Sequence, residues 1–438
     1  MKKLLIRLSI DSEIQASWLR EQRSAIKPNV LSCLSTAITA AILLVLCPSS
    51  SNRNFILTGF LAKTERYDEA EQQALERLDM TDSAHTDSAH TDLSHYDVAV
   101  IGAGIAGLTC AKELHQAGLR LVVLEKSRGV GGRVATRRLQ NTWADHGTCY
   151  LSPKGDRFRE FLDSLLTAGV IQVWTDTVQA VDRSGHLQEA GDRVPRYAAP
   201  TGITAIAKSL APGLEIRFSQ RVVVVEPIEQ GWKLTADQTD SNQTVELTAK
   251  ALVVAIPAPQ AVELLQPIAL LPTDFLHSLK SVEFFPSLSV MAGYGRDRLT
   301  DWTAHYPTVK AVTFSDHSEL GYLGFDSSKH PASDQAVFVV QSSAAFADRY
   351  LNAIDLQPAA TQLLQAVAQQ FLPWLTTPDW MQVHRWRYAF AKTPIADRYL
   401  VASTAAPLVC AGDWCGGRKV EDGFLSGLAA AEYVLKNS

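Results

Sequence analysis

The stretch Tyr96–Arg138, YDVAVIGAGIAGLTCAKELHQAGLRLVVLEKSRGVGGRVATRR, decides the fold that this sequence predicts. Apolar residues 98–101 predict a β-strand, a helical pattern follows a glycine-rich turn, and residues 121–124 predict a second strand that ends on Glu125. This order of elements is the fingerprint of a dinucleotide-binding βαβ unit. We therefore expect an α/β domain that holds a nucleotide cofactor.

Each position of the turn has a physical role. Gly102 permits the tight turn, Gly104 lets a pyrophosphate approach the backbone, and Gly107 lets the helix pack closely on the strand. The free N–H groups at the start of the helix favour phosphate oxygens. Glu125, 23 positions after Gly102, is placed to accept hydrogen bonds from ribose hydroxyls. The residues expected to bind the cofactor here are Gly102, Ala103, Gly104, Ile105, Ala106, Gly107, Glu125 and Lys126.

A second glycine run, GVGGRVATRR (129–138), follows the acidic residue. Its glycines would let a loop fold over the cofactor, and Arg133 would bring a permanent positive charge to a pyrophosphate. Gly132 and Arg133 therefore join the expected cofactor contacts. The run resembles the extension found in two-dinucleotide-binding flavoproteins of the amine oxidase type, and this resemblance implies FAD as the cofactor.

The likeness covers about 340 residues, from Tyr96 to the C-terminus, and it is to the renalase-like branch of the FAD-dependent amine oxidase superfamily. The segments that carry it are GVGGRVATRR (129–138) with ADHGTCYL (144–151), RYAAPTGITAIAKSLA (196–211), ALVVAIPAPQAVELL (251–265), VHRWRYAFA (383–391) and LVCAGDWCGGRKVEDGFLSGLAAA (408–431).

The sequence departs from the family pattern where we expect the substrate. Thr148-Cys149 stands for the family's Ala-Gln, and Ile203 stands for its Met. In residues 341–347, Gln, Phe and Ala replace the family's His, Trp and Ser. The flavin half of the resemblance is therefore stronger than the substrate half.

The C-terminal segment predicts the other end of the flavin site. Residues 408–411 predict a strand that ends at Gly412-Asp413, and Asp413 there can accept a hydrogen bond from a ribityl hydroxyl. Residues 420–427 then open an Ala-rich helix over 427–434, whose N-terminus would stabilise negative charge on a flavin ring. Gly412, Asp413, Glu421 and Asp422 are the contacts expected here.

The resemblance implies oxidation of isomeric dihydronicotinamides, the 2- and 6-dihydro forms of NAD(P), to NAD(P)+, with O2 reduced to hydrogen peroxide. Hydride transfer to a flavin needs no general base, so no catalytic residue is assigned. His146 is interpreted as a structural hydrogen-bonding residue, while Tyr150 and Trp386 are candidates for stacking on the substrate ring. Two alternatives stay open: an amine oxidase or desaturase on the same fold, and a flavin-binding scaffold without catalysis.

The predicted fold class is α/β, a Rossmann-like FAD-binding domain with a second, mixed α+β substrate domain. Helices are expected over 156–167 and 357–371, and strands with turns between them over 221–227, 232–236, 245–247 and 251–256. Val222 in this meander is the expected backbone contact of the adenine. The predicted domains are 96–265 with 400–438 for FAD, including an inserted part of the substrate domain near 150–200, and 266–399 for the substrate.

The first 95 residues differ from the rest. Residues 1–79 form an N-terminal extension whose uncharged segment 29–47 is long enough to span a bilayer. The repeats in 80–95 predict a disordered polar leader, and we interpret Met80 as the true start, with a membrane anchor through 29–47 as the alternative.

Composition limits the remaining classes. The net charge of −5 gives no basic field for nucleic acid. The six cysteines show no metal spacing and no CxxC pair, so no metal is expected, and the thiols indicate a reducing, cytoplasmic compartment. Cys149 and Cys415 are interpreted as packing residues rather than redox partners. The expected partners are a small-molecule substrate and O2, and the oligomeric state stays open.

Overall fold

The computed structural model describes residues 94–182, 184–188, 193–241, 243–315, 317–330 and 332–437. The predicted extension 1–79, its apolar segment 29–47 and the predicted leader up to residue 93 lie outside the described residues. Within the part that is described, no helix has the length and apolar character needed to cross a membrane.

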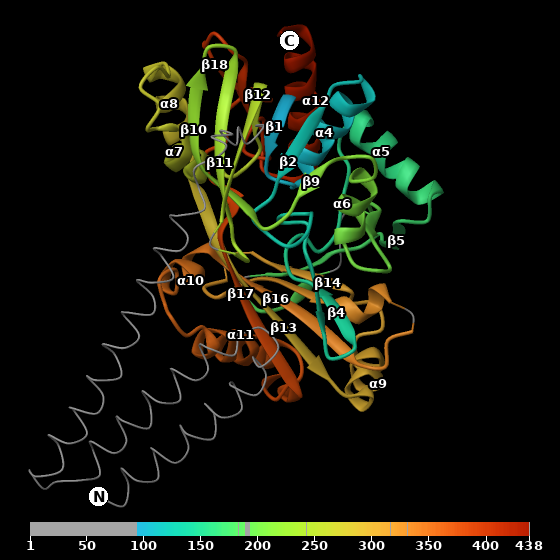
Figure 1. Ribbon diagram of the computed structural model, residues 1–438. Helices are drawn as coiled ribbons and strands as arrows, with labels where there is room; N and C mark the ends of the chain where they lie inside the picture. The colour runs from blue at the N-terminus through green and yellow to red at the C-terminus, as the bar shows by residue number, and fades with distance from the viewer. Residues whose placement is uncertain are drawn as a thin grey trace, which may run out of the picture. The chain divides into compact units, whose positions relative to one another are not determined.

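An eight-stranded sheet carries the fingerprint (Figure 1). Six strands lie in the order β10 (Gln220–Ile228), β11 (Gly231–Gln238), β12 (Thr244–Val254), β1 (Ser94–Ile101), β2 (Leu121–Leu124) and β9 (Ile216–Arg217). β19 (Leu408–Cys410) pairs with β12 and with β18 (Leu400–Ala402). The pairs that β1 makes with β12 and β2, and β12 with β19, are parallel.

Both faces of this sheet are covered, which explains the uninterrupted apolar run of β1. Val98 and Val100 point into one buried cluster, whereas Ala99 and Ile101 point into another. The second cluster is completed by side chains of α7 (Ala258–Leu265) and α8 (Thr273–Lys280).

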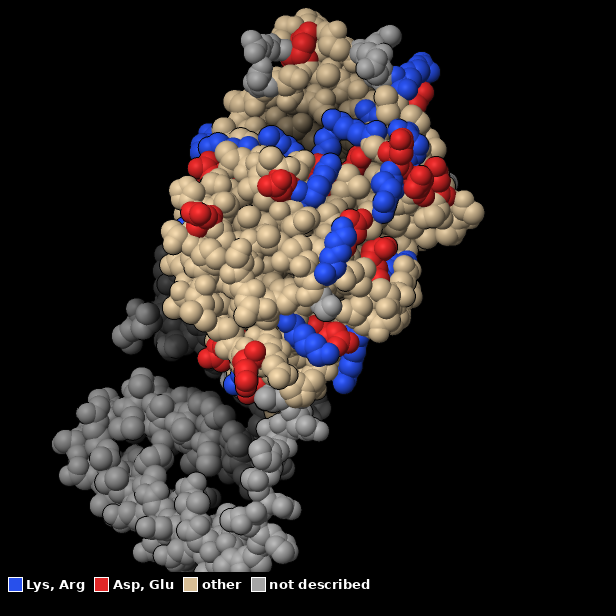
Figure 2. Space-filling view, turned by 90° about the horizontal axis from the view of Figure 1, so that it is seen from above, with Lys and Arg blue, Asp and Glu red and all other residues tan. Residues whose placement is uncertain are grey.

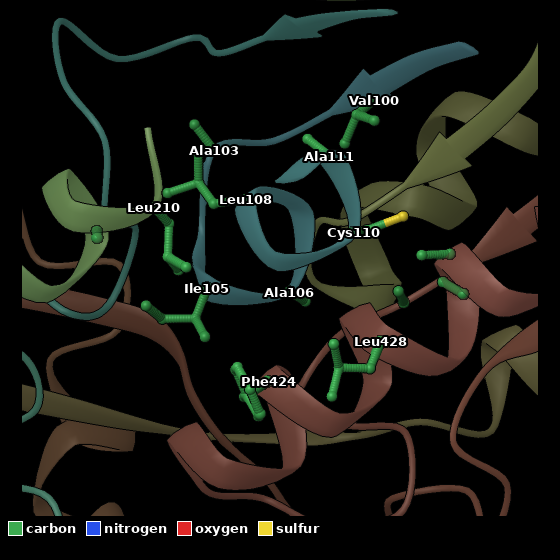
Figure 3. Close-up of a cluster of buried hydrophobic side chains, with 14 of the residues drawn as sticks. Val100, Ala103, Ile105, Ala106, Leu108, Cys110, Ala111, Leu210, Phe424 and Leu428 are labelled. Carbon is green, nitrogen blue, oxygen red and sulfur yellow. The ribbon is translucent and has the colours of Figure 1, made fainter. Parts of the chain in front are cut away.

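Four helices lie on the first face. They are α4 (Ile105–Gln116), α5 (Asp156–Thr167), α6 (Thr204–Leu210) and α12 (Val420–Asn437). Figure 3 shows Leu108 and Ala111 of α4 together with Leu210 of α6 and with Phe424 and Leu428 of α12. The helical spacing of residues 108, 111 and 114 therefore buries this stripe, as predicted.

A second sheet has seven strands. Its strands lie in the order β17 (Trp380–Ala391), β13 (Phe284–Tyr294), β16 (Ala336–Ser342), β15 (Leu320–Phe325), β14 (Ala311–Phe314), β6 (Gln179–Val181) and β7 (Leu187–Gln188). Side chains of α9 (Arg296–His305), α11 (Gln357–Gln370) and η2 (Pro373–Thr376) complete one buried cluster of this sheet, and α10 (Ala344–Arg349) adds Phe346 and Ala347.

The other face of this sheet meets segments that follow the fingerprint. Met291, Val337 and Val339 form a buried cluster with Ala144 and Cys149. Two two-stranded sheets lie in these segments, β3 (Thr136–Leu139) with β4 (Thr142–Asp145), and β5 (Gln172–Thr175) with β8 (Arg196–Ala198). η1 (Asp326–Lys329) follows β15 and contacts the end of β4, where Lys329 donates to Asp145. The domain boundaries themselves stay a prediction.

Three sequence predictions of local structure differ from the fold. The separate strands 245–247 and 251–256 were wrong, because β12 is continuous: Thr248 and Ala249 pair with His95 and Tyr96 on one side and with β11 on the other. β1 accordingly begins at Ser94, within the predicted leader. The last helix extends past residue 434 to Asn437.

Adding a side chain at Gly107 and at Gly104 should affect the stability of the protein differently. A Cβ at Gly107 would lie 2.0 Å from the carbonyl oxygen of Gly102, whereas a Cβ at Gly104 meets no atom within 4 Å. We expect Gly107→Ala to lower the free energy of unfolding by about 1–3 kcal/mol. Gly104→Ser, which places a favourable capping residue at the start of α4, should not lower it. Urea denaturation of both variants checks this, and equal losses would contradict the packing role of Gly107.

Candidate functional site

A cavity of about 1250 Å³ lies at the carboxyl end of β1 and is lined from both sheets. Ligands of open α/β sheets bind at this edge. We call the part around Gly102, Gly104, Glu125 and Lys126 the glycine end. The part around His146–Tyr150, Tyr322, Gln341, His384 and Trp386 is the histidine end.

The glycine end fits a dinucleotide. Gly104 precedes α4, whose N-terminus has no side-chain cap, and Cβ space at Gly104 is open. Anionic oxygens can therefore approach the first N–H groups of the helix. Glu125 is held in place by the N–H groups of Ala103 and Ser127, both at 2.8 Å. Each carboxylate oxygen keeps a further lone pair for a ribose hydroxyl.

Arg133 and Asp413, predicted from separate parts of the sequence, contact each other beside the cavity. The guanidinium donates to both carboxylate oxygens, with Nη1–Oδ2 at 2.7 Å and Nη2–Oδ1 at 2.5 Å. Nη1 also donates to the carbonyl oxygen of Ala389 at 3.1 Å. This bidentate geometry fixes the guanidinium plane next to the loop that contains Gly131 and Gly132.

Eleven of the fifteen predicted cofactor residues line the cavity, and four do not; the four are Ala103, Gly107, Val222 and Asp422. Val222 packs against the second buried cluster of the sheet. Asp422 accepts hydrogen bonds from the N–H groups of Arg418 and Lys419, each at 3.0 Å, and pairs with Arg398. Its carboxylate therefore orders the entry to α12 instead of facing the cavity.

Glu421 lines the cavity, but its carboxylate is engaged elsewhere. Its Oε2 accepts from the N–H of Lys154 at 2.8 Å and its Oε1 from the N–H of Gly155 at 2.6 Å. Gly155 precedes α5, so Glu421 joins the starts of α5 and α12. Sequence reasoning assigned this residue to the cofactor because a side chain near a helix N-terminus can serve either purpose.

Three aromatic rings build the histidine end. The ring centroids of His146 and His384 are 4.8 Å apart, and Trp386 lies 5.3 Å from His146 and 4.3 Å from His384. Trp386 Nε1 donates to the carbonyl oxygen of His146 at 2.8 Å. Within the described residues, His146 Nδ1 is buried without a partner. The ring of His146 is thus held by contacts with two other rings, while its main chain donates to the carbonyl oxygen of Ala135 and accepts from Trp386.

Both histidines are neutral at physiological pH. Burial, His384 and Arg137 lower the pKa of His146 to about 3. Burial and the guanidinium groups of Arg137 and Arg385 lower the pKa of His384 to about 4. The two rings therefore present a polar but uncharged surface next to fixed positive charge.

The two predicted stacking residues reach the same cavity through different contacts. Trp386 belongs to the histidine cluster, whereas the ring of Tyr150 lies 6.2 Å from those of Trp174 and Tyr322. Both are half-buried and line the cavity. The structure thus leaves each with an exposed part that a planar ligand can contact.

Sequence reasoning missed Arg137. It lines the cavity from β3, is half-buried, and has no hydrogen-bond or ion-pair partner among the described residues. The signal was present in the Arg-Arg pair of the second glycine run, because strand alternation sends 137 and 138 to opposite faces. Arg385 and Arg387, by contrast, donate to carbonyl oxygens after α10.

The charge of the cavity opposes that of the whole chain. Eight lining residues are Lys or Arg and four are Asp or Glu, while the chain carries −5. On the face shown in Figure 2, basic and acidic side chains lie near one another, and residues of other kinds cover most of the surface. Positive charge inside a cleft raises the local concentration of anionic ligands.

The four described cysteines, at positions 110, 149, 410 and 415, are free and buried. Burial raises the pKa of Cys149 to about 12, so its thiol is not ionised at neutral pH. This agrees with the interpretation of Cys149 as a packing residue.

The chain matches two families, the NAD(P)-binding Rossmann-like domain over residues 100–165 and the flavin containing amine oxidoreductase family over residues 155–435. Flavin-containing amine oxidase B of Cavia porcellus is 49% identical over 59 residues, 13% of this chain and 11% of that protein. The L-amino-acid oxidase of Siganus canaliculatus is 41% identical over 68 residues, 15% of this chain and 13% of that protein. The matched segments thus span about a tenth of the curated relatives.

Solved structures share the fold. A putrescine oxidase double mutant has a TM-score of 0.60 at 14% identity, covering 78% of this chain and 99% of its own. A putative protoporphyrinogen oxidase from an Exiguobacterium species has a TM-score of 0.56 at 12% identity, covering 79% and 99%. The predicted fold class, α/β with a Rossmann-like domain, is confirmed.

The depressed pKa of His146 predicts acid sensitivity. The unfolded chain protonates this histidine near pH 6.5, whereas the folded chain does so near pH 3. The free energy of unfolding should therefore fall as the pH drops below about 6.5, by up to about 1.4 kcal/mol per pH unit from this residue. Urea denaturation at several pH values should show a shallower slope for His146→Gln, while the exposed His277→Gln keeps the wild-type slope. An unchanged slope in His146→Gln would contradict the burial of a neutral ring.

Proposed function

The chain belongs to the flavin containing amine oxidoreductase family, and on that premise we propose that it is an FAD-dependent oxidase of the renalase-like type. Its substrates would be the 2- and 6-dihydro isomers of NAD(P)H. The reaction balances as dihydronicotinamide, O2 and one proton giving NAD(P)+ and hydrogen peroxide. When bound, FAD, the cofactor of this family, would supply the hydride acceptor and the electrons for O2.

The observation that carries the substrate class is the charge of Arg137 near His146 and His384, for which the described residues offer no ion-pair partner. NAD(P) brings a pyrophosphate into the cavity, and a half-buried guanidinium without a protein partner favours such an anion. Arg385, whose charge also lowers the pKa of His384, adds to the positive field. A protonated amine would meet unfavourable charge at this end.

The chain's own residues would bind and orient both groups. The start of α4 and Glu125 hold the phosphates and ribose of FAD at the glycine end, and the Arg133–Asp413 pair lies beside them. Trp386 and Tyr150 offer ring faces to the nicotinamide. The neutral imidazole of His146 adds no competing charge, and hydride transfer from the substrate requires no base from it.

Amine oxidation is the second candidate. The similarity to amine oxidases is one argument for it, and the aromatic wall formed by Tyr150, Tyr322 and Trp386 is the structural one. A neutral amine with an apolar side chain would fit against these rings.

Anaerobic mixing of the purified full-length chain with 6-dihydro-NAD tests the proposal. We expect the visible flavin band to bleach within seconds and to recover when air is admitted. An oxidised flavin that bleaches with benzylamine or putrescine, and not with 6-dihydro-NAD, would transfer the assignment to amine oxidation. Arg137→Gln serves as the matched variant: it should raise the KM for 6-dihydro-NAD about tenfold, the effect of one lost charged contact.

The riboside of 6-dihydronicotinamide, which carries no phosphate, provides the internal control for Arg137. Its rate should be the same in the wild type and in Arg137→Gln. Arg138→Gln, a change at the exposed neighbour on the opposite face of β3, should leave both substrates unaffected. If Arg137→Gln lowered the oxidation rates of the riboside and the dinucleotide equally, Arg137 would not bind the phosphates.

A further inference from the structure

Three charged side chains are fully buried between the two sheets, away from the cavity lining. Lys329 Nζ lies 2.9 Å from Asp145 Oδ2 and also pairs with Asp326 Oδ1. All three residues have 0% relative exposure. The backbone N–H of Asp145 donates to Asp326 Oδ2 at 3.1 Å, so both the main chain and the side chain of Asp145 are held from η1.

Asp145 also ties this cluster to the fingerprint domain. Its Oδ1 accepts from the N–H of Ile203 at 2.8 Å and from the hydroxyl of Thr136 at 2.7 Å. Ile203 precedes α6 and Thr136 begins β3. The side chain of Asp145 therefore joins β3 and α6 to η1, which follows β15 of the seven-stranded sheet.

The residues that follow Asp145 form a wall of the histidine end. The carbonyl oxygen of His146 accepts from Trp386, and that of Gly147 accepts from Gln341 Nε2 at 2.7 Å. Cys149 Sγ lies 3.4 Å from the carbonyl oxygen of Asp145. A displacement of Asp145 would therefore move His146 and Cys149 with it.

We propose that Lys329 is a positioning residue that, by pairing with Asp145 and Asp326, fixes residues 145–149 as the wall of the histidine end. The role concerns the geometry of the wall, so it holds for whichever substrate the cavity takes.

Charge balance makes Lys329 the controlling member. Without its ammonium, the two buried carboxylates would face each other with no opposite charge beside them. Their repulsion and desolvation would then favour a structure in which they move apart. Burial raises the pKa of Asp145, and the Lys329 ammonium opposes that rise. The two carboxylates raise the pKa of Lys329, so it stays charged. The Trp174 ring, 5.2 Å from Nζ, closes the site from the other side.

Cys149 reports directly on the wall, because its thiol is buried against the carbonyl oxygens of 145 and 147. We would label the FAD-loaded full-length chain with iodoacetamide and follow each cysteine by peptide mass mapping. In Lys329→Met, the labelling rate of Cys149 should rise at least about tenfold, as local opening predicts. Cys110, Cys410 and Cys415, buried elsewhere, should stay protected.

Matched variants complete the test. Lys310→Met removes another lysine of the same region, which donates to the carbonyl oxygen of Trp174 at 2.7 Å and does not touch Asp145, so Cys149 should stay protected. Lys329→Met/Asp326→Asn removes one negative charge together with the positive one, so the buried site keeps its wild-type net charge, and Cys149 should return toward wild-type protection. If Lys329→Met does not fold, Asp145→Asn replaces it, with the same selective exposure of Cys149 expected. Unchanged Cys149 labelling, or an equal rise at Cys110, Cys149, Cys410 and Cys415, would overturn the proposal.

Discussion

The buried ion cluster of Asp145, Asp326 and Lys329 is the contact on which the arrangement of the two sheets around the cavity depends. Each buried charge costs several kcal/mol in desolvation, so the cluster is stable only while all three groups meet. The partners Asp145 and Lys329 are 184 positions apart in sequence. The cluster joins the two layers next to the cavity wall, together with the hydrogen bonds that Trp386 and Gln341 donate to the carbonyl oxygens of His146 and Gly147.

The two ends of the cavity are built by different physics. The glycine end follows from local sequence: a strand, a turn without side chains and an uncapped helix start produce a phosphate site within about thirty residues. The histidine end is assembled from β17, β15, β16 and the segment after β4, and its polarity arises from burial of neutral imidazoles beside Arg137. A glycine end built from one local motif is thus combined with a histidine end built from segments far apart in the sequence.

This difference explains what the sequence could predict. The strands around Gly102 and the buried stripe of α4 follow from the spacing of apolar residues, and they were predicted. The presence of Glu125 and Asp413 in the cavity lining follows from short motifs, and it was predicted as well. Lys329 was not, because a lysine in a turn has no pattern that indicates burial; only its partners show it. The hydrogen bonds that the carboxylates of Glu421 and Asp422 accept from backbone N–H groups were not predicted either, because a sequence does not show which N–H groups lie near a side chain.

The central claim is that one cavity holds FAD at the glycine end and a phosphate-bearing nicotinamide at the histidine end. A crystal structure of the FAD-loaded chain with NAD+, the product of the proposed reaction, tests it most directly. We expect the nicotinamide against Trp386 and the pyrophosphate of NAD+ in contact with Arg137, with residues 145–149 as described. NAD+ bound outside the histidine end, or with its phosphates away from Arg137, would contradict the claim.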